Sequence, residues 1–275
     1  MTNSQKELFE IALQCEKRND IDGAISNLEE ALRLGYDGKV TVKLSKLYRM
    51  QDRKDQAYLV MKMVPDLFSD KTVFEEYAKV LQENNFLIEA LQLKNLSSNR
   101  INLTVKPVDL SEQRKIIKEF QAKTVITQTD YLKLFKLDLP TYLTFCKSLL
   151  LNITPSFAIR LTICEDLIKL GIKEEIPVII LGKEYRFVPI QTCLLKENTI
   201  YQDVISIIYT RYNKEPNKLP LMLGEANLSL GSLYPMIDQF IDDAREFTDS
   251  LISFLDNGQG FSYDNLLQKI YKQQF

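Results

Sequence analysis

The chain has 275 residues, of which 45% are hydrophobic and 26% charged, and its formal net charge is -2. These values are ordinary for a globular protein and indicate no general attraction to nucleic acid or to anionic lipid. The chain contains no histidine, which removes the Ser-His-Asp and Cys-His arrangements of nucleophilic catalysis and a common zinc ligand.

The N-terminus, the apolar runs and the cysteines predict the cellular compartment. Met1–Gln5 lacks a basic stretch followed by an apolar core, so we expect no signal peptide. The longest apolar runs, such as Pro177–Leu181, are too short to cross a bilayer. The cysteines are widely separated, lie in apolar patterns and form no C-x-x-C pair, which predicts buried reduced thiols in a cytoplasmic protein. They are Cys15, Cys146, Cys164 and Cys193.

Small residues recur in the N-terminal third of the chain at a fixed interval of 33 residues. A period in this range is typical of helical repeat arrays, in which two antiparallel helices approach most closely where neither has a bulky side chain. A leucine at such a crossing would cost roughly 1 to 3 kcal/mol through overpacking. The two equally spaced sets are Ala24, Ala57 and Ala90, and Ala12, Ser45 and Ala78.

The apolar pattern predicts two helices in each repeat. Ser4 and Glu7 fit a capping box for the first helix, which Asn19 and Asp20 end, and the second runs from about Asp22 to Gly35. The later units repeat this plan. The predicted inward residues are Leu8, Ile11, Ala12, Cys15, Ala24, Ile25, Leu28 and Ala31 in the first unit, Leu44, Ser45, Tyr48, Ala57, Val60, Met61 and Val64 in the second, and Phe74, Tyr77, Ala78, Leu81, Ala90 and Leu91 in the third.

On the basis of these small residues and helix pairs, the segment 1–98 resembles the tetratricopeptide repeat family. The stretch Asp20–Ile25 is similar to the turn that leads into the family's second helix. The resemblance implies a TPR-like α-α superhelix of about three helix pairs and a role in binding other proteins.

In that family the first helix of each pair lines a concave groove, so the resemblance also implies a set of groove residues. An apolar floor beside the basic strip Lys39, Lys43, Lys46 and Arg49 would suit an amphipathic or acidic peptide. Two alternatives stay open: these charges are simply solvated, or the chain's own segments fill the groove. The implied groove residues are Phe9, Leu13, Val42, Lys46, Arg49, Lys79 and Gln82.

The repeat pattern ends in the polar stretch Ser97–Pro107, and we assign residues 99–125 to a linker with an adaptor or capping helix. Asp109 and Ser111 can cap that helix, which runs to about Lys123. Residues 126–275 then form a mostly helical domain with one β-hairpin. One predicted helix begins at Thr129 and another covers Thr141–Leu151. After a break at Thr154 and Pro155, a longer helix runs to about Leu170 and stops at Gly171. Further helices are predicted over Ile200–Tyr212, Tyr234–Leu255 and Tyr263–Lys272.

The strongest strand signal lies near residues 176–189. Ile176–Leu181 and Glu184–Val188 flank Gly182 and Lys183, which predicts a hairpin with a two-residue primed turn that Pro189 ends. The helix over Tyr234–Leu255 has an acidic outer face, which we interpret as solvated rather than as a metal site. Its acidic residues are Asp238, Asp242, Asp243, Glu246 and Asp249.

The stretch from about 140 to 255 is similar to the C-terminal half of uncharacterised tetratricopeptide proteins of low-GC Gram-positive bacteria. The similarity is strongest at Gly171–Pro189 and implies a shared architecture and a cytoplasmic, bacterial origin.

We therefore expect a mainly α cytoplasmic adaptor that binds a peptide or protein in the repeat groove. We expect it to need no cofactor or metal, to contact neither nucleic acid nor membrane, and to be no enzyme. A sensor of a short signalling peptide and an enzyme with a site between its domains are the alternatives. The sequence gives neither the partner nor the oligomeric state.

Overall fold

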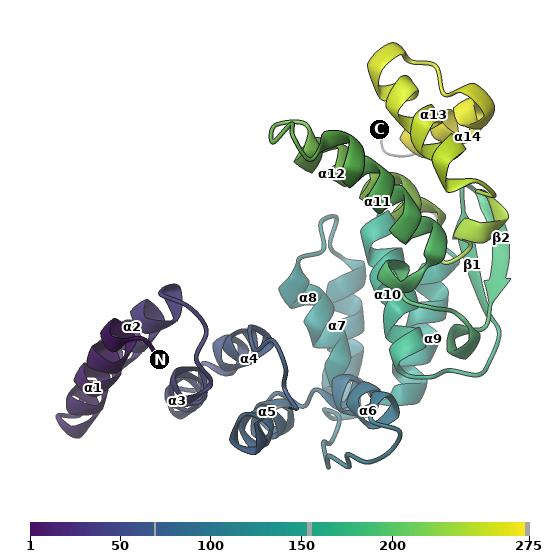
Figure 1. Cartoon of the computed structure of the whole chain (residues 1–275). Coiled ribbons are helices and arrows are strands. Elements are labelled where there is room, and N and C mark those ends of the chain that lie inside the picture. Colours follow the sequence, from purple (N-terminus) through teal and green to yellow (C-terminus); the bar gives the residue numbers. More distant parts are fainter. Residues whose placement is uncertain (69, 153–155, 273–275) are drawn as a thin grey trace. The chain divides into compact units, whose positions relative to one another are not determined.

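The computed structural model describes residues 1–68, 70–152 and 156–272. Over these residues the chain is mainly helical, with fourteen α-helices and one antiparallel hairpin (Figure 1). The chain forms two compact units. Unit 1 contains Met1–Lys94 and Asn99–Leu139, and unit 2 contains Asn95–Ser98 and Pro140–Phe275. The expected fold class, a mainly α chain with a single hairpin, is confirmed for the described residues.

The six helices that the 33-residue period predicts are present in unit 1. The small residues of the period are buried, with Ala12, Ala24, Ser45, Ala57 and Ala90 each at most 3% exposed, while Ala78 is half-buried. Helix α3 packs against α2, α4 and α5. The helices are α1 (Asn3–Lys17), α2 (Ile21–Arg33), α3 (Gly38–Met50), α4 (Lys54–Lys62), α5 (Lys71–Asn84) and α6 (Leu87–Leu96).

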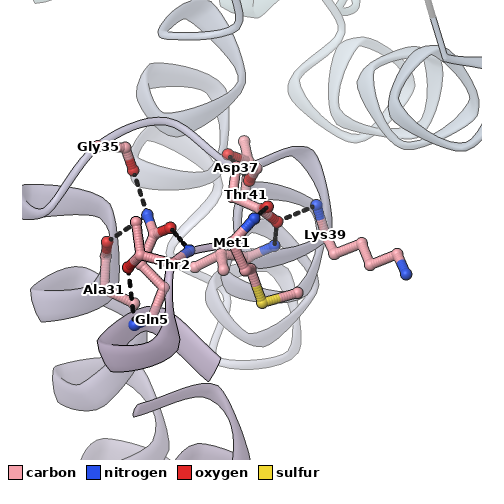
Figure 2. Close-up of polar contacts among 9 residues, drawn as sticks. Met1, Thr2, Gln5, Ala31, Gly35, Asp37, Lys39 and Thr41 are labelled. Carbon is pink, nitrogen blue, oxygen red and sulfur yellow. Dashed lines mark hydrogen bonds and ion pairs between the residues drawn. The ribbon is translucent and has the colours of Figure 1, made fainter. Parts of the chain in front are cut away.

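Helix α1 begins earlier than the sequence predicts. Thr2 is its N-cap and forms the capping box with Gln5, so the predicted pair Ser4 and Glu7 is wrong. The Gln5 side chain also donates to the carbonyls of Ala31, at 3.1 Å, and Gly35, at 2.8 Å (Figure 2). This second role ties α1 to the end of α2, which favours Gln5 over the exposed Glu7 as the capping partner.

Asp37 holds the start of α3 in the same region. Its carboxylate accepts from the backbone N–H of Lys39 and of Val40, and from the Met1 ammonium at 2.8 Å (Figure 2). Burial alone would raise the pKa of Asp37, but the hydrogen bonds and the Met1 ammonium lower it overall. The junction of the first three helices is therefore fixed by polar contacts.

Residues 99–139 belong with the repeats, which differs from the expected linker over 99–125 and domain over 126–275. The predicted cap Asp109 is confirmed at the start of α7 (Leu110–Gln121), whereas α8 (Gln128–Lys133) begins after Thr127 rather than at Thr129. A 3-10 turn (Leu134–Lys136) follows. Phe135 is buried and meets Phe86 edge-on at 6.3 Å, which removes apolar surface of both segments from water.

Unit 2 combines the hairpin with helices. Its elements are α9 (Leu139–Leu150), α10 (Phe157–Lys169), β1 (Ile176–Ile180), β2 (Lys183–Phe187), α11 (Thr199–Tyr212), α12 (Leu219–Leu233), α13 (Ala244–Asn257) and α14 (Asp264–Lys272), with 3-10 turns at Pro189–Gln191, Leu195–Glu197, Ile237–Gln239 and Phe261–Tyr263. Three predicted boundaries agree with the structure within two residues: the helix end before Gly171, the helix over Ile200–Tyr212 and the helix end at Lys272. The predicted break at Thr154 and Pro155 lies outside the described residues.

The predicted continuous helix over Tyr234–Leu255 is wrong. Helix α12 ends at Leu233, and Pro235 cannot continue it because proline lacks the backbone N–H. Asp243 then accepts from the Glu246 N–H at 2.8 Å and starts α13. Ile237 and Ile241 are still buried, so the apolar pattern marks inward residues even where the helix is interrupted.

The hairpin is confirmed, but its turn is displaced by one residue from the predicted Gly182 and Lys183. Ile180 pairs with Lys183, and the turn residues are Leu181 and Gly182, both with positive φ, 49° and 76°. The predicted turn would put Pro177 at a hydrogen-bonded ladder position, where proline has no N–H to give. The observed register places it opposite Arg186, at a position that needs none.

The cysteines carry free thiols, but only two of them are buried as predicted. Cys146 and Cys164 are fully buried, and burial raises the pKa of both thiols. Cys15 is half-buried and Cys193 is exposed, so the prediction is wrong for Cys193. Among the described helices, none combines the length and apolar character that crossing a membrane requires.

Candidate interaction surface

The seven predicted groove residues lie on α1, α3 and α5, the first helices of the three repeats. We call these residues, Phe9, Leu13, Val42, Lys46, Arg49, Lys79 and Gln82, the first-helix face. An ion pair joins Lys43 of α3 to Glu16 of α1 at 2.5 Å, and further ion pairs join α3 to α5. The three helices that carry the face are therefore neighbours within unit 1.

The face offers two exposed lysines next to apolar positions. Leu13, Lys46 and Lys79 occupy equivalent positions of the 33-residue period, and both lysines are exposed. Phe9 and Leu13 are half-buried, so part of each side chain stays accessible. Val42 is only 6% exposed and serves the packing of α3 rather than the surface.

Arg49 has a structural role that the sequence did not indicate. Its guanidinium bonds Glu76 through Nε at 2.8 Å and Nη2 at 3.1 Å, and it also pairs with Glu83. Glu76 is 1% exposed and accepts a further bond from Ser45 Oγ at 2.8 Å. Burial alone would lower the pKa of Arg49, but these carboxylates raise it overall. Arg49 therefore neutralises a buried carboxylate and is not a free cation for a ligand.

The predicted basic strip is consequently smaller than the sequence indicates. Lys43 pairs with Glu16 and Arg49 with Glu76, which leaves Lys39 and Lys46 as the exposed cations of the strip. On the first-helix face itself, the exposed cations are Lys46 and Lys79. The missed partner, Glu76, did leave a signal in the sequence. It is an acidic residue directly before Tyr77, within the apolar stripe of the third repeat.

Gln82, at the far end of the face, binds the chain's own backbone. Its Nε2 donates to the carbonyl of Thr104 at 3.4 Å, and Asn85 donates to the carbonyl of Lys106 at 3.1 Å. Val105, between these two carbonyls, is 8% exposed. Residues 101–108, which we call the extended segment, therefore occupy the α5 end of the face.

A buried carboxylate also joins the second helices to α5. Glu89 of α6 accepts from Tyr58 at 2.5 Å, from Lys62 at 2.8 Å and from Tyr77. Burial and the nearby Glu89 carboxylate raise the pKa of Tyr77 well above its ordinary value. The cluster links α4, α5 and α6, so the face lies on a scaffold with fixed polar contacts.

A separate hollow of about 100 Å³ lies between α4 and α8 in unit 1. Tyr58, Leu59, Phe86 and Leu132 form its apolar lining, and Lys133 stands among its polar residues. Pockets that enclose a small ligand usually exceed roughly 300 Å³. This hollow lies on the second-helix side and contains none of the predicted site residues.

Metal-binding groups do not assemble in the described part of the chain. Within it, no three His, Cys, Asp or Glu side chains come together as a metal site. The acidic row of α13 and the turn before it is engaged elsewhere: Asp243 caps the helix, Asp249 pairs with Arg211 at 2.6 Å, and Glu246 accepts from Ser262. The row therefore has structural partners.

No family model matches this chain, and neither a curated protein nor a solved structure matches it.

Proposed function

We propose that the helix pairs of unit 1 form a TPR-like superhelix and that the first-helix face binds an extended acidic segment of a partner protein. The chain would then act as a cytoplasmic adaptor, a location that the buried free thiols Cys146 and Cys164 support. The observation that carries the proposal is the extended segment, because the chain already holds extended backbone on this surface.

The extended segment indicates how recognition works. Gln82, in the last turn of α5, and Asn85, the C-cap of that helix, donate to carbonyls two residues apart in the segment. Val105 meanwhile points inward and is buried. Amide donors thus hold the backbone while the side chain between the two held carbonyls, Val105, is buried.

The chemistry of the partner follows from the remaining part of the face. Lys46 and Lys79 are exposed, and neither forms an ion pair within the described residues. Leu13, at the equivalent position of the first repeat, is apolar and half-buried. A segment that carries carboxylates for the two lysines and apolar side chains for α1 complements this surface.

The test is peptide binding measured by fluorescence anisotropy, with a panel of labelled acidic-apolar peptides and their lysine-substituted counterparts. The double variant K46E/K79E should weaken binding of the acidic peptides about tenfold or more, and added salt should reduce this difference. Arg49 is unsuitable for this test because its replacement would leave the buried Glu76 carboxylate without its ion pair.

The matched control is R114E/K118E, which makes the same change in charge at two exposed positions of α7. It should bind the acidic peptides as the wild type does. Equal losses in the two double variants would show general electrostatic attraction. Unchanged binding by K46E/K79E would reject the first-helix face as the site.

A further inference from the structure

The hairpin of unit 2 has one strand whose outer edge is open. In a two-residue hairpin the pair that closes the turn, here Ile180 and Lys183, exchanges both ladder hydrogen bonds. The pattern alternates from there, so the backbone N–H and C=O of Glu184 and Arg186 face away from β1. These four groups bond to no other backbone or side chain within the described residues.

The opposite edge of the hairpin, on β1, offers fewer free backbone groups. Pro177 has no N–H, and the carbonyl of Ile179 accepts from Arg160 Nη1 at 3.5 Å. On β2, by contrast, Lys183, Glu184 and Arg186 are all exposed, and Figure 1 draws β2 as the outer strand of the hairpin. An open strand edge is a template for pairing with another strand.

We propose that this edge pairs with the same edge of a second copy of the chain. In an antiparallel arrangement about a two-fold axis beside Tyr185, the outward N–H and C=O of Glu184 meet those of Arg186 in the partner. The symmetry repeats the pair, which gives four backbone hydrogen bonds. The two hairpins would become one four-stranded antiparallel sheet.

The charges select both the partner and the register. This arrangement places the Glu184 carboxylate opposite the Arg186 guanidinium twice, on the same face of the new sheet. The neighbouring hydrogen-bonded registers would place Glu184 opposite Glu184, or Arg186 opposite Arg186, which like charges disfavour. The strand is thus self-complementary in charge only when it is centred on Tyr185.

Formation of the pair costs little within each copy. Arg186 contacts Glu184 at 3.3 Å and Glu175 at 3.5 Å within its own chain, but all three side chains are at least half exposed. Exposed ion pairs contribute little to stability and exchange readily. The Tyr185 ring already rests on Phe240, with 5.4 Å between centroids, so it is held beside the axis.

The expected dimer is weak. A five-residue edge buries far less than the roughly 1,200 Å² of a stable interface, so the dimer should dissociate on dilution. Sedimentation velocity on the full chain, over roughly a hundredfold range of concentration, should show a monomer that shifts toward a dimer.

Charge variants of the two edge residues identify the interface. The single variants R186E and E184R should each remain monomeric throughout, because like charges then face each other. The double variant E184R/R186E restores the opposite pairs and should dimerise as the wild type does. A monomeric wild type, a single variant that still dimerises, or a double variant that does not recover would each overturn the proposal. Circular dichroism checks that every variant is folded.

Discussion

The two units enclose buried charges in different ways. In unit 1, Glu89 lies between helices and receives bonds from Tyr58, Tyr77 and the Lys62 ammonium. In unit 2, Arg160 is partly buried, and it donates to the backbone carbonyls of Ser232, at 2.5 Å, and Ile179. Burial lowers the pKa of Arg160. Glu89 thus has side-chain partners from other helices, whereas Arg160 has backbone carbonyls of α12 and β1 as partners.

This difference explains what each unit requires of its sequence. A side-chain partner such as Glu89 must lie at one particular position of the repeat, so unit 1 depends on a few residues far apart in sequence. The carbonyl of Ser232 near the end of α12 is available whatever the side chain there, so the Arg160 contact depends more on where α12 stops.

The largest expected effect comes from removing the buried carboxylate of unit 1. Glu89→Ala leaves the hydroxyls of Tyr58 and Tyr77 without their acceptor, while Lys62, about half exposed, returns to water. We expect a loss of roughly 3 kcal/mol of unfolding free energy. Urea denaturation followed by circular dichroism measures it, with Glu89→Gln, which keeps an acceptor, expected to lose less. Equal stability of Glu89→Ala and wild type would contradict the role of the cluster.

The next effect separates the two cations that α3 contributes to the first-helix face. Arg49→Met leaves Glu76 buried without its ion pair and should cost about 2 to 3 kcal/mol. Lys46→Met changes an exposed residue on the same helix and should stay within about 0.5 kcal/mol. The same denaturation experiment compares them. Similar costs for the two variants would show that Arg49 is a surface residue after all.

A third substitution should stabilise unit 2. Leu181 has a φ of 49° at the first turn position, a conformation that asparagine tolerates better than leucine. Leu181→Asn should therefore raise the unfolding free energy by about 1 kcal/mol. Thermal unfolding measures the shift, and Gly182→Ala, at a φ of 76°, should shift it in the opposite direction. Destabilisation by Leu181→Asn would mean that burial of the leucine outweighs the turn.

The smallest effect is a pH dependence in unit 1. Hydrogen bonds from Lys123 and Thr127 lower the pKa of Asp130 from its ordinary value of 3.8 to about 2. The ionised form is therefore favoured by folding, and its contribution is present above about pH 4 and lost as the pH falls toward 2. Asp130→Asn should melt at a lower temperature at neutral pH and lose less between about pH 4 and pH 2 than the wild type. If the melting temperatures of the two proteins fell by the same amount between about pH 4 and pH 2, the link between Asp130 ionisation and stability would be contradicted.

The sequence predicts much of unit 1 because its period repeats at every helix crossing. The burial of Ala24, Ala57 and Ala90 follows from their spacing alone. The partners of Arg49 and Gln82 do not follow from the period, because hydrogen bonds between distant segments have no fixed spacing. The one sign of Glu76 in the sequence is its place within the apolar stripe of the third repeat. Of the predicted face, only Lys46 and Lys79 are exposed cations as expected.

Unit 2 was harder to predict because local breaks decide its elements. The apolar stripe at Ile237 and Ile241 correctly marks buried residues, but periodicity does not reveal that Pro235 and the Asp243 cap divide the helix. The hairpin turn likewise depends on the absent N–H of Pro177, which a count of glycines near the turn does not consider.

Lysine reactivity in the unmodified protein tests the central claim, that the first-helix face binds an extended acidic segment. The chain is acetylated with and without the tightest acidic peptide of the panel, and mass spectrometry gives the modified fraction of each lysine. We predict that the peptide protects Lys46 and Lys79, while Lys118, exposed on α7, reacts as before. Protection of Lys133 and Lys136 instead, or of lysines in unit 2 alone, would contradict the account.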